Sequence, residues 1–195
     1  MRLTSAEIDQ GILDVAAGIF AQHGYAQTSV QQVADAVGYS KAGLLHRFGS
    51  KEAMYLAGLE AGTALVDTIL SESAALPFEP GRPRAILEIF AAQAIQHPGM
   101  VQMLLRAFEP SNDGPGKDQI RELGYRLLAL LNPPFSTPVE RLRVVLAMQL
   151  LVNAALAQSH DITFDVNVPH DQLIPMVVDL SLLVLNEPAA VHSVS

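Results

Sequence analysis

The chain has 195 residues, half of them hydrophobic and 16% charged, which is enough apolar material for a sizeable buried core and excludes a disordered chain. It contains no cysteine, so a disulfide framework and a thiolate metal site are excluded. The net charge of −8 argues at first against a nucleic-acid partner, but the charge is unevenly distributed.

Residues 1–51 hold four basic and four acidic groups, so residues 52–195 carry the whole excess of negative charge. No acid occurs between Ala36 and Lys51. An acidic body with a locally cationic tip repels DNA except at one surface. The pattern therefore leaves a nucleic-acid partner open for the N-terminal part.

Neither end of the chain shows a membrane segment. The first ten residues lack the apolar run of a signal peptide, and the most apolar stretch, Met176 to Leu185, is ten residues long with Asp179 inside it. Such a stretch is too short to span a bilayer. We expect a cytoplasmic protein that does not enter a membrane.

Three helices are predicted near the N-terminus, of which the second and third are short. Thr4 and Glu7 have capping-box spacing, and an apolar stripe of helical period follows until Gly24. Ser29 and Gln32 repeat that spacing before a helix over 30–37, which Gly38 ends. Ser40 then caps a helix over 41–47.

The second and third of these helices form a helix-turn-helix pattern. They are joined by Gly38, Tyr39 and Ser40, and the third begins with Lys41, Ala42 and Gly43. Small residues there allow a helix to enter a major groove while Lys41 meets a phosphate or a base edge, although the same small residues also permit tight helix packing. Ser50 caps a further helix with Lys51 in its first turn, where a phosphate is favoured.

The span from Thr4 to about Leu59 resembles the DNA-binding domain of the TetR family of transcriptional repressors. The matching residues occur at fixed spacing: Phe20, Gly24-Tyr25, Thr28-Ser29-Val30, Val33-Ala34, Gly38, Ser40-Lys41, Leu44, Phe48 and Ser50-Lys51-Glu52-Ala53. The resemblance implies an all-helical homodimer of about nine helices, with an N-terminal three-helix head that binds an operator in double-stranded DNA and a C-terminal body that binds a small molecule.

Carried over residue by residue, the resemblance places phosphate contacts on Thr28 or Ser29 and on Lys51. Base-edge or groove contacts are placed on Ser40, Lys41, Ala42, Gly43, His46 and Arg47. Leu45 stands where the family usually has a tyrosine that braces the backbone, and Arg47 stands where an aromatic or histidine is common. We interpret Arg47 as a contact to a phosphate or a guanine that replaces the tyrosine contact that Leu45 cannot make. The alternative is that Leu45 itself touches a thymine methyl group.

The body is predicted to contain five or six more helices. A long helix over 51–75 links it to the head, and proline and glycine clusters separate further helices over 84–96, 100–108, 118–131, 139–159 and 171–186. The residues between 160 and 170 alternate in polarity but have no partner strand, so we expect an ordered connector. The domain boundaries are therefore 1–50 for the DNA-binding domain and 51–195 for the ligand-binding and dimerisation domain.

The last two long helices are apolar nearly all the way round, which predicts a two-fold dimer interface, with a buried monomeric core as the alternative. A pocket for a moderately lipophilic effector is expected between the body helices. Its candidate residues are Phe90, Gln93, His97, Met100, Met103, Phe108, Tyr125, Gln149 and Asn153. Gln93, Gln149 and Asn153 are the sharpest candidates, because amides within apolar helices need partners.

The predicted function is that of a transcriptional repressor whose DNA affinity falls when the effector binds. This requires an effector that prefers a conformation of the dimer in which the spacing of the two heads does not match the operator. We expect no enzymatic activity, cofactor or metal. One alternative is an all-helical metal-dependent enzyme, based on His160-Asp161 and His170-Asp171. Another is an interaction module that kept the head but lost DNA binding.

Overall fold

The fold is entirely helical over the residues that the computed structural model describes, which are 4–106, 114–131, 137–159 and 170–186. The nine helices in these ranges are α1 (Ser5–His23), α2 (Val30–Val37), α3 (Lys41–Phe48), α4 (Lys51–Ala74), α5 (Arg82–Gln96), α6 (Pro98–Leu105), α7 (Lys117–Leu131), α8 (Pro138–Ser159) and α9 (His170–Asn186). The predicted all-α class is therefore confirmed. The expected connector over 160–169 lies outside the described residues.

The predicted helix starts in the head are present as hydrogen-bonded caps. Thr4 and Glu7 form a capping box on α1, and Ser29 and Gln32 form one on α2. The Ser40 hydroxyl accepts from the Gly43 amide at 3.0 Å, and the Ser50 hydroxyl accepts from the Ala53 amide at the same distance. Local spacing was sufficient because each cap joins residues three apart.

The body helices after α4 begin one or two residues earlier than the sequence predicted, and three of them have a proline in the first turn. Pro83 lies in the first turn of α5, Pro98 opens α6 and Pro138 opens α8. Proline is well tolerated there because the first amides of a helix have no partner within it. We had taken Pro83 as the end of a proline cluster that separates helices, whereas it belongs to α5.

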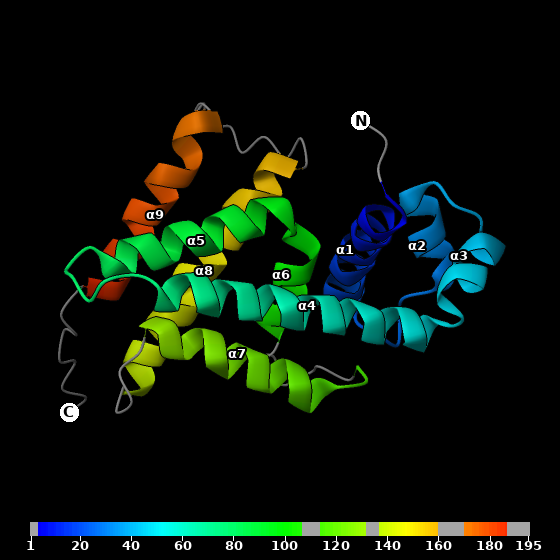
Figure 1. Ribbon diagram of the computed structural model, residues 1–195, viewed down its shortest axis with the longest axis horizontal. Helices are drawn as coiled ribbons and strands as arrows, with labels where there is room; N and C mark the ends of the chain where they lie inside the picture. The colour runs from blue at the N-terminus through cyan, green and yellow to red at the C-terminus, as the bar shows by residue number, and fades with distance from the viewer. Residues whose placement is uncertain (1–3, 107–113, 132–136, 160–169, 187–195) are drawn as a thin grey trace, which may run out of the picture.

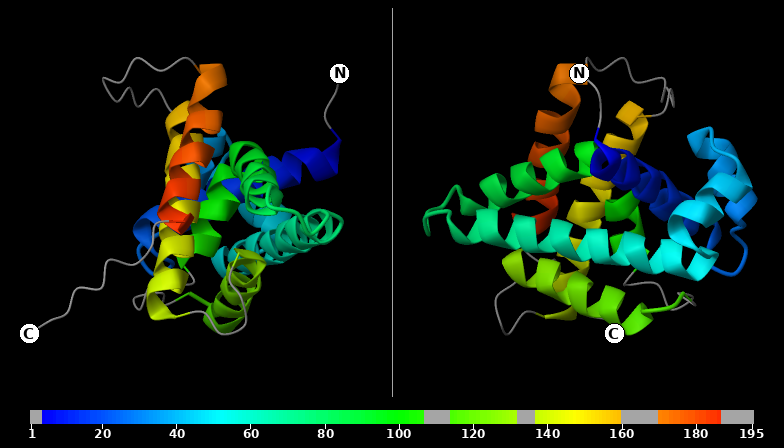
Figure 2. Two further views of the ribbon diagram at one scale, coloured as in Figure 1. Left: turned by 90° about the vertical axis from the view of Figure 1, so that its left-hand side faces the viewer. Right: turned by 45° about the vertical axis from the view of Figure 1, so that its right-hand side comes forward.

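The helices α1, α2 and α3 form a head at one end of the molecule, and α4 runs from this head along the body (Figure 1). The helices α8 and α9 lie side by side at the far end of the body from α3 (Figures 1 and 2). A single buried apolar cluster extends from Ile12 in α1 to Val178 in α9. The core therefore continues from the head into the body.

Helix α1 is the main link between the two parts. It packs on α2 within the head and on α4 and α6 in the body. Its Asp14 carboxylate accepts hydrogen bonds from the Gly99 and Met100 amides, at 3.3 and 2.9 Å, at the start of α6. Since α6 has no side-chain cap of its own, α1 supplies the acceptors that its N-terminus needs.

Helix α4 is long and apolar enough to cross a bilayer by length and composition, and within the described residues it alone meets that test. It nevertheless packs against α1, α5, α6 and α7. Its residues Leu59, Val66 and Ile69 are fully enclosed by these helices. We therefore describe α4 as a core helix.

Candidate nucleic-acid interface

The turn between α2 and α3 is formed by Gly38, whose φ of 71° lies in the left-handed region that glycine tolerates best. Val33 and Ala34 of α2 and Leu44 of α3 are fully buried in the apolar core. These apolar contacts hold two eight-residue helices that are too short to be stable alone. The result is an α3 whose N-terminal turn faces outward.

Most of the predicted DNA contacts lie on this outward surface. Ser29, Ser40, Lys41, Ala42 and His46 are exposed, and Gly43 and Leu45 are half-buried at the edge of the same helix. The side chains present a hydroxyl, an ammonium, an imidazole and little bulk. Such a surface suits contact with a phosphate backbone and a groove.

Thr28 occupies a different position from the others. Its side chain is 2% exposed and its hydroxyl donates to the Gly24 carbonyl at 2.8 Å, so it is turned into the α1–α2 loop. The neighbouring Ser29 is exposed and caps α2. Of the two phosphate candidates at this helix start, Ser29 is therefore the accessible one.

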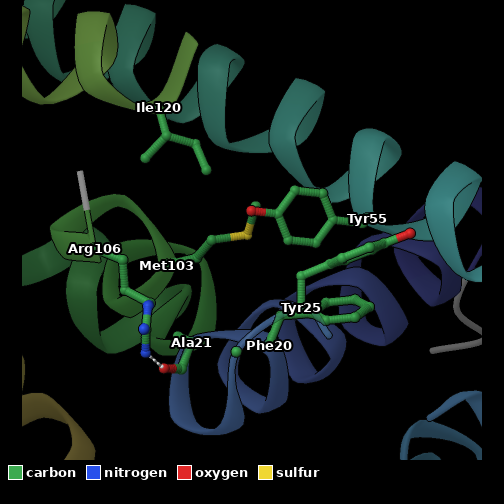
Figure 3. Close-up of a pocket in the computed structure, with 8 residues that line it drawn as sticks. Phe20, Ala21, Tyr25, Tyr55, Met103, Arg106 and Ile120 are labelled. Carbon is green, nitrogen blue, oxygen red and sulfur yellow. Dashed lines mark hydrogen bonds between the residues drawn. The ribbon is translucent and has the colours of Figure 1, made fainter. Parts of the chain in front are cut away.

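Lys51 also turns towards the protein. Its ammonium donates to the carbonyls of Tyr25 at 2.9 Å and Thr28 at 3.1 Å, and it lies 4.3 Å from the centre of the Tyr25 ring. That ring packs with Phe20 and Tyr55 in an aromatic cluster between α1 and α4 (Figure 3). Lys51 thus fastens the α1–α2 loop to the start of α4, and a phosphate contact by Lys51 stays a prediction.

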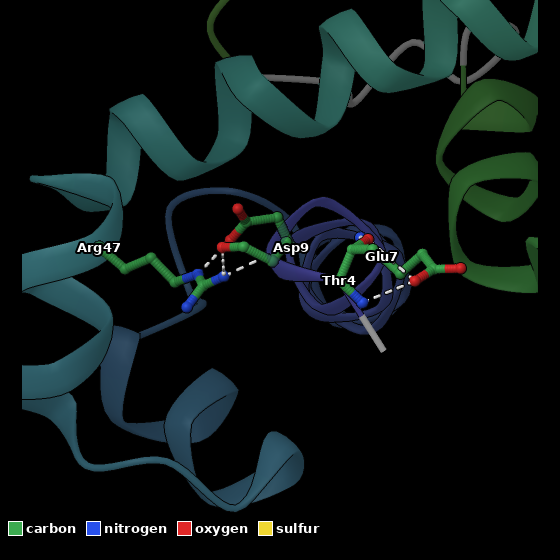
Figure 4. A network of polar contacts seen from close by, with 5 residues as sticks. Thr4, Glu7, Asp9 and Arg47 are labelled. Carbon is green, nitrogen blue, oxygen red and sulfur yellow. Dashed lines mark hydrogen bonds and ion pairs between the residues drawn. The ribbon is translucent and has the colours of Figure 1, made fainter. Parts of the chain in front are cut away.

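Arg47 is directed towards α1 (Figure 4). Its guanidinium forms an ion pair with Asp9 and donates to the Ser5 carbonyl and hydroxyl at 3.0 and 2.9 Å. The hydrogen bond to Asp9 is also the main reason that the pKa of Arg47 lies above its ordinary value. Our interpretation of Arg47 as a DNA contact did not foresee this arrangement, because its partners lie about forty residues earlier in the chain.

The predicted effector pocket is dispersed over the body. Phe90, Met100 and Met103 are buried, Gln93 and His97 are half-buried, and Phe108 lies outside the described residues. Tyr125, Gln149 and Asn153 are exposed. The two amides of α8 therefore face outward.

A small hollow lies between α1, α4, α6 and α7 (Figure 3). It measures about 10 Å³, which is about the space of one water molecule. Of the predicted effector-pocket residues, Met103 lines this hollow. The full lining is Phe20, Ala21, Gly24, Tyr25, Tyr55, Met103, Arg106 and Ile120. The sequence offered no signal for most of this set, because the residues come from four helices, the α1–α2 loop and the residue after α6.

The alternative metal site cannot be placed on this fold, because 160–169 lie outside the described residues and the side chains of His170 and Asp171 are not described. Within the part of the chain that is described, no three His, Asp or Glu side chains gather as a metal would require. Asp9, by contrast, was not singled out by the sequence, although its ion pair with Arg47 joins α1 to α3.

Two short helices joined at a left-handed glycine, with the second exposing its N-terminal turn, define a helix-turn-helix domain. Residues 12–57 match the model of the family described as bacterial regulatory proteins, tetR family. The chain is also 36% identical over 64 residues to the HTH-type transcriptional repressor AcnR of Corynebacterium glutamicum. That match covers 33% of this chain and about a third of the relative (34%).

Solved structures extend the likeness to the body. A TetR-like transcriptional regulator from Rhodococcus sp. RHA1 has a TM-score of 0.55 at 20% identity, over 93% of this chain and 97% of that one. AibR, solved in complex with isovaleryl coenzyme A and operator DNA, has the same TM-score and identity over 89% of this chain and 97% of that one. The described part of the chain, body included, therefore has the same fold as these regulators.

Proposed function

We propose that this protein is a cytoplasmic transcriptional repressor that binds operator DNA as a homodimer and is released by a small, moderately lipophilic effector. The observation that carries the proposal is the outward N-terminal turn of α3, within a segment that matches the model of the tetR family. The repressor AcnR and the operator complex of AibR, which are similar to this chain, support the choice of DNA as the partner.

A homodimer is supported by an apolar stripe along the outer faces of α8 and α9. Large apolar side chains are exposed there at helical spacing: Val139, Leu142, Leu146 and Leu150 on α8, and Met176, Leu180 and Leu183 on α9. A contiguous apolar surface of this kind is covered in most stable proteins. Two copies joined there would present two heads to half-sites about one turn of DNA, ~34 Å, apart.

The division of labour that we propose follows the sequence boundaries, with 1–50 binding DNA and 51–195 binding the effector and the second copy. The half-buried Gln93 and His97, beside the buried Phe90 and Met100, are the candidates for effector contacts that face the body interior. Isovaleryl coenzyme A is a suitable first probe, since AibR was solved with it.

The test begins with selection of bound sequences from a random duplex library by the purified protein. Enrichment of one motif is expected, and fluorescence anisotropy on that motif then compares Lys41→Ala with Lys117→Ala, an exposed lysine of α7 in the body. We expect Lys41→Ala to weaken binding and to reduce the salt dependence by about one phosphate charge per head, and Lys117→Ala to leave both unchanged. Failure of any sequence to enrich would refute DNA recognition.

A further inference from the structure

The C-terminal turn of α3 is tied to the N-terminal turn of α1. Arg47, the residue before the last of α3, pairs with Asp9 and donates to both the carbonyl and the hydroxyl of Ser5. Ser5 and Asp9 are four residues apart and so share one face of α1. One guanidinium therefore joins two helices that lie about forty residues apart in the sequence (Figure 4).

Helix α3 needs such a tie, because its apolar anchorage is small. It has eight residues, and Leu44 is the residue of this helix that is buried. Phe48 in the last turn is half-buried against the same core, so the apolar contacts of α3 come from Leu44 and Phe48, four residues apart on one face. Contacts along a single face leave the helix able to roll about that face. A polar attachment beside it, at Arg47, fixes the direction in which the N-terminal turn points.

We propose that Arg47 is a positioning residue, which with Asp9 and Ser5 sets the angle of α3 in the head and makes no contact with DNA itself. The proposal rests on the proposed DNA-binding function and extends it. Two geometric facts support it. Nε and Nη2 of the guanidinium are already bound by α1. Of the exposed DNA candidates on or next to α3, Ser40, Lys41 and Ala42 lie at the other end of the helix, and His46 is the one beside Arg47.

The charge of Asp9 makes the proposal distinguishable from simple electrostatics. Removal of an acid from the head increases its attraction for DNA at any sequence. If Asp9 only opposes DNA, Asp9→Ala tightens binding. If Asp9 positions α3 through Arg47, Asp9→Ala weakens binding to the selected motif, and Arg47→Ala weakens it in the same way.

The experiment is a double-mutant cycle on the motif that the wild-type protein selects from the random duplex library. We expect Asp9→Ala and Arg47→Ala each to weaken binding about fivefold per head, and the double variant to be no weaker than the worse single variant. The salt dependence is expected to remain that of the wild type. The control is Asp35→Ala, which removes an exposed acid of α2. Among the described residues this acid is bonded only to Gln31, one turn away, and its removal is expected not to weaken binding.

The opposite pattern overturns the proposal: Arg47→Ala lowers the salt dependence by about one phosphate charge per head while Asp9→Ala tightens binding. A second measurement requires no DNA. Hydrogen exchange of the α3 amides is expected to quicken in both single variants and to stay unchanged in Asp35→Ala. If the wild-type protein selects no motif, the proposed function fails, whereas unchanged exchange in Asp9→Ala and Arg47→Ala refutes the positioning role itself.

Discussion

The contact between α1 and α6 allows almost no change of volume, and we expect Gly99→Ala to disrupt it. A methyl group on Gly99 would lie 1.9 Å from the Asp14 carbonyl oxygen and 2.8 Å from the Gly18 nitrogen. Both neighbours are backbone atoms within a helix, so no side-chain rotation relieves the overlap. Ordinary contact begins at 3.4 Å, so α6 must move away from α1 by about 1.5 Å.

The expected loss of stability follows from two effects. Overpacking of this kind costs about 1–3 kcal/mol, and a displaced α6 also weakens the hydrogen bonds from its first amides to Asp14, each worth about 1.5 kcal/mol or more because the acceptor is charged. The helix propensity of alanine returns at most about 1 kcal/mol. We therefore expect Gly99→Ala to lower the free energy of unfolding by about 3 kcal/mol.

Urea denaturation followed by circular dichroism measures this change, and two glycines of α1 calibrate it, one inside the contact with α6 and one outside it. Gly18→Ala places its methyl 3.3 Å from the Gly99 Cα and should cost less, while Gly11→Ala meets nothing within 4 Å and should stabilise α1 slightly. The reasoning is refuted if Gly99→Ala is as stable as the wild type, or if the order of the three variants differs.

Three further predictions concern other parts of the molecule. Lys51→Met should lower the free energy of unfolding by about 1–2 kcal/mol, because the carbonyls of the α1–α2 loop lose their donor; a urea titration without change would show that the ammonium is dispensable. Burial raises the pKa of Asp14 above its ordinary 3.8, so near that pH the native protein holds a proton that the unfolded chain releases. The stability of the wild type relative to Asp14→Asn should therefore increase as the pH falls from neutral towards about 4, and a decrease in urea titrations would contradict the burial argument. Leu146→Glu on α8 should convert a sedimenting dimer into monomers, whereas Ile95→Glu on α5 should not; dimers that persist would place the interface elsewhere.

The sequence was sufficient where an interaction is local. The caps of α1 to α4 and the glycine turn after α2 each depend on residues within five positions, so spacing alone predicted them. The first turns of α5, α6 and α8 were missed because proline was treated only as a helix breaker. Its compatibility with a first turn is equally local, and a stricter application of that rule would have found these starts.

The sequence was insufficient where two distant segments meet. Arg47 was interpreted as a DNA contact because the resemblance places it on the surface that reads DNA, yet Asp9 lies beside it in space. Gln149 was placed inside the body because its helix is apolar nearly all the way round. In the structure Gln149 lies on the exposed face of that helix. These assignments depend on the packing of helices, which no local pattern records.

The two carboxylates of α1 have a mechanical consequence. Asp9 holds α3 and Asp14 holds the start of α6, and five residues separate them, which places them about 140° apart around the helix. Helix α1 is therefore held on two different sides, by α3 through Asp9 and by α6 through Asp14. A displacement of α6 must either roll or shift α1, and with it the inclination of α3, or break the Asp14 contact.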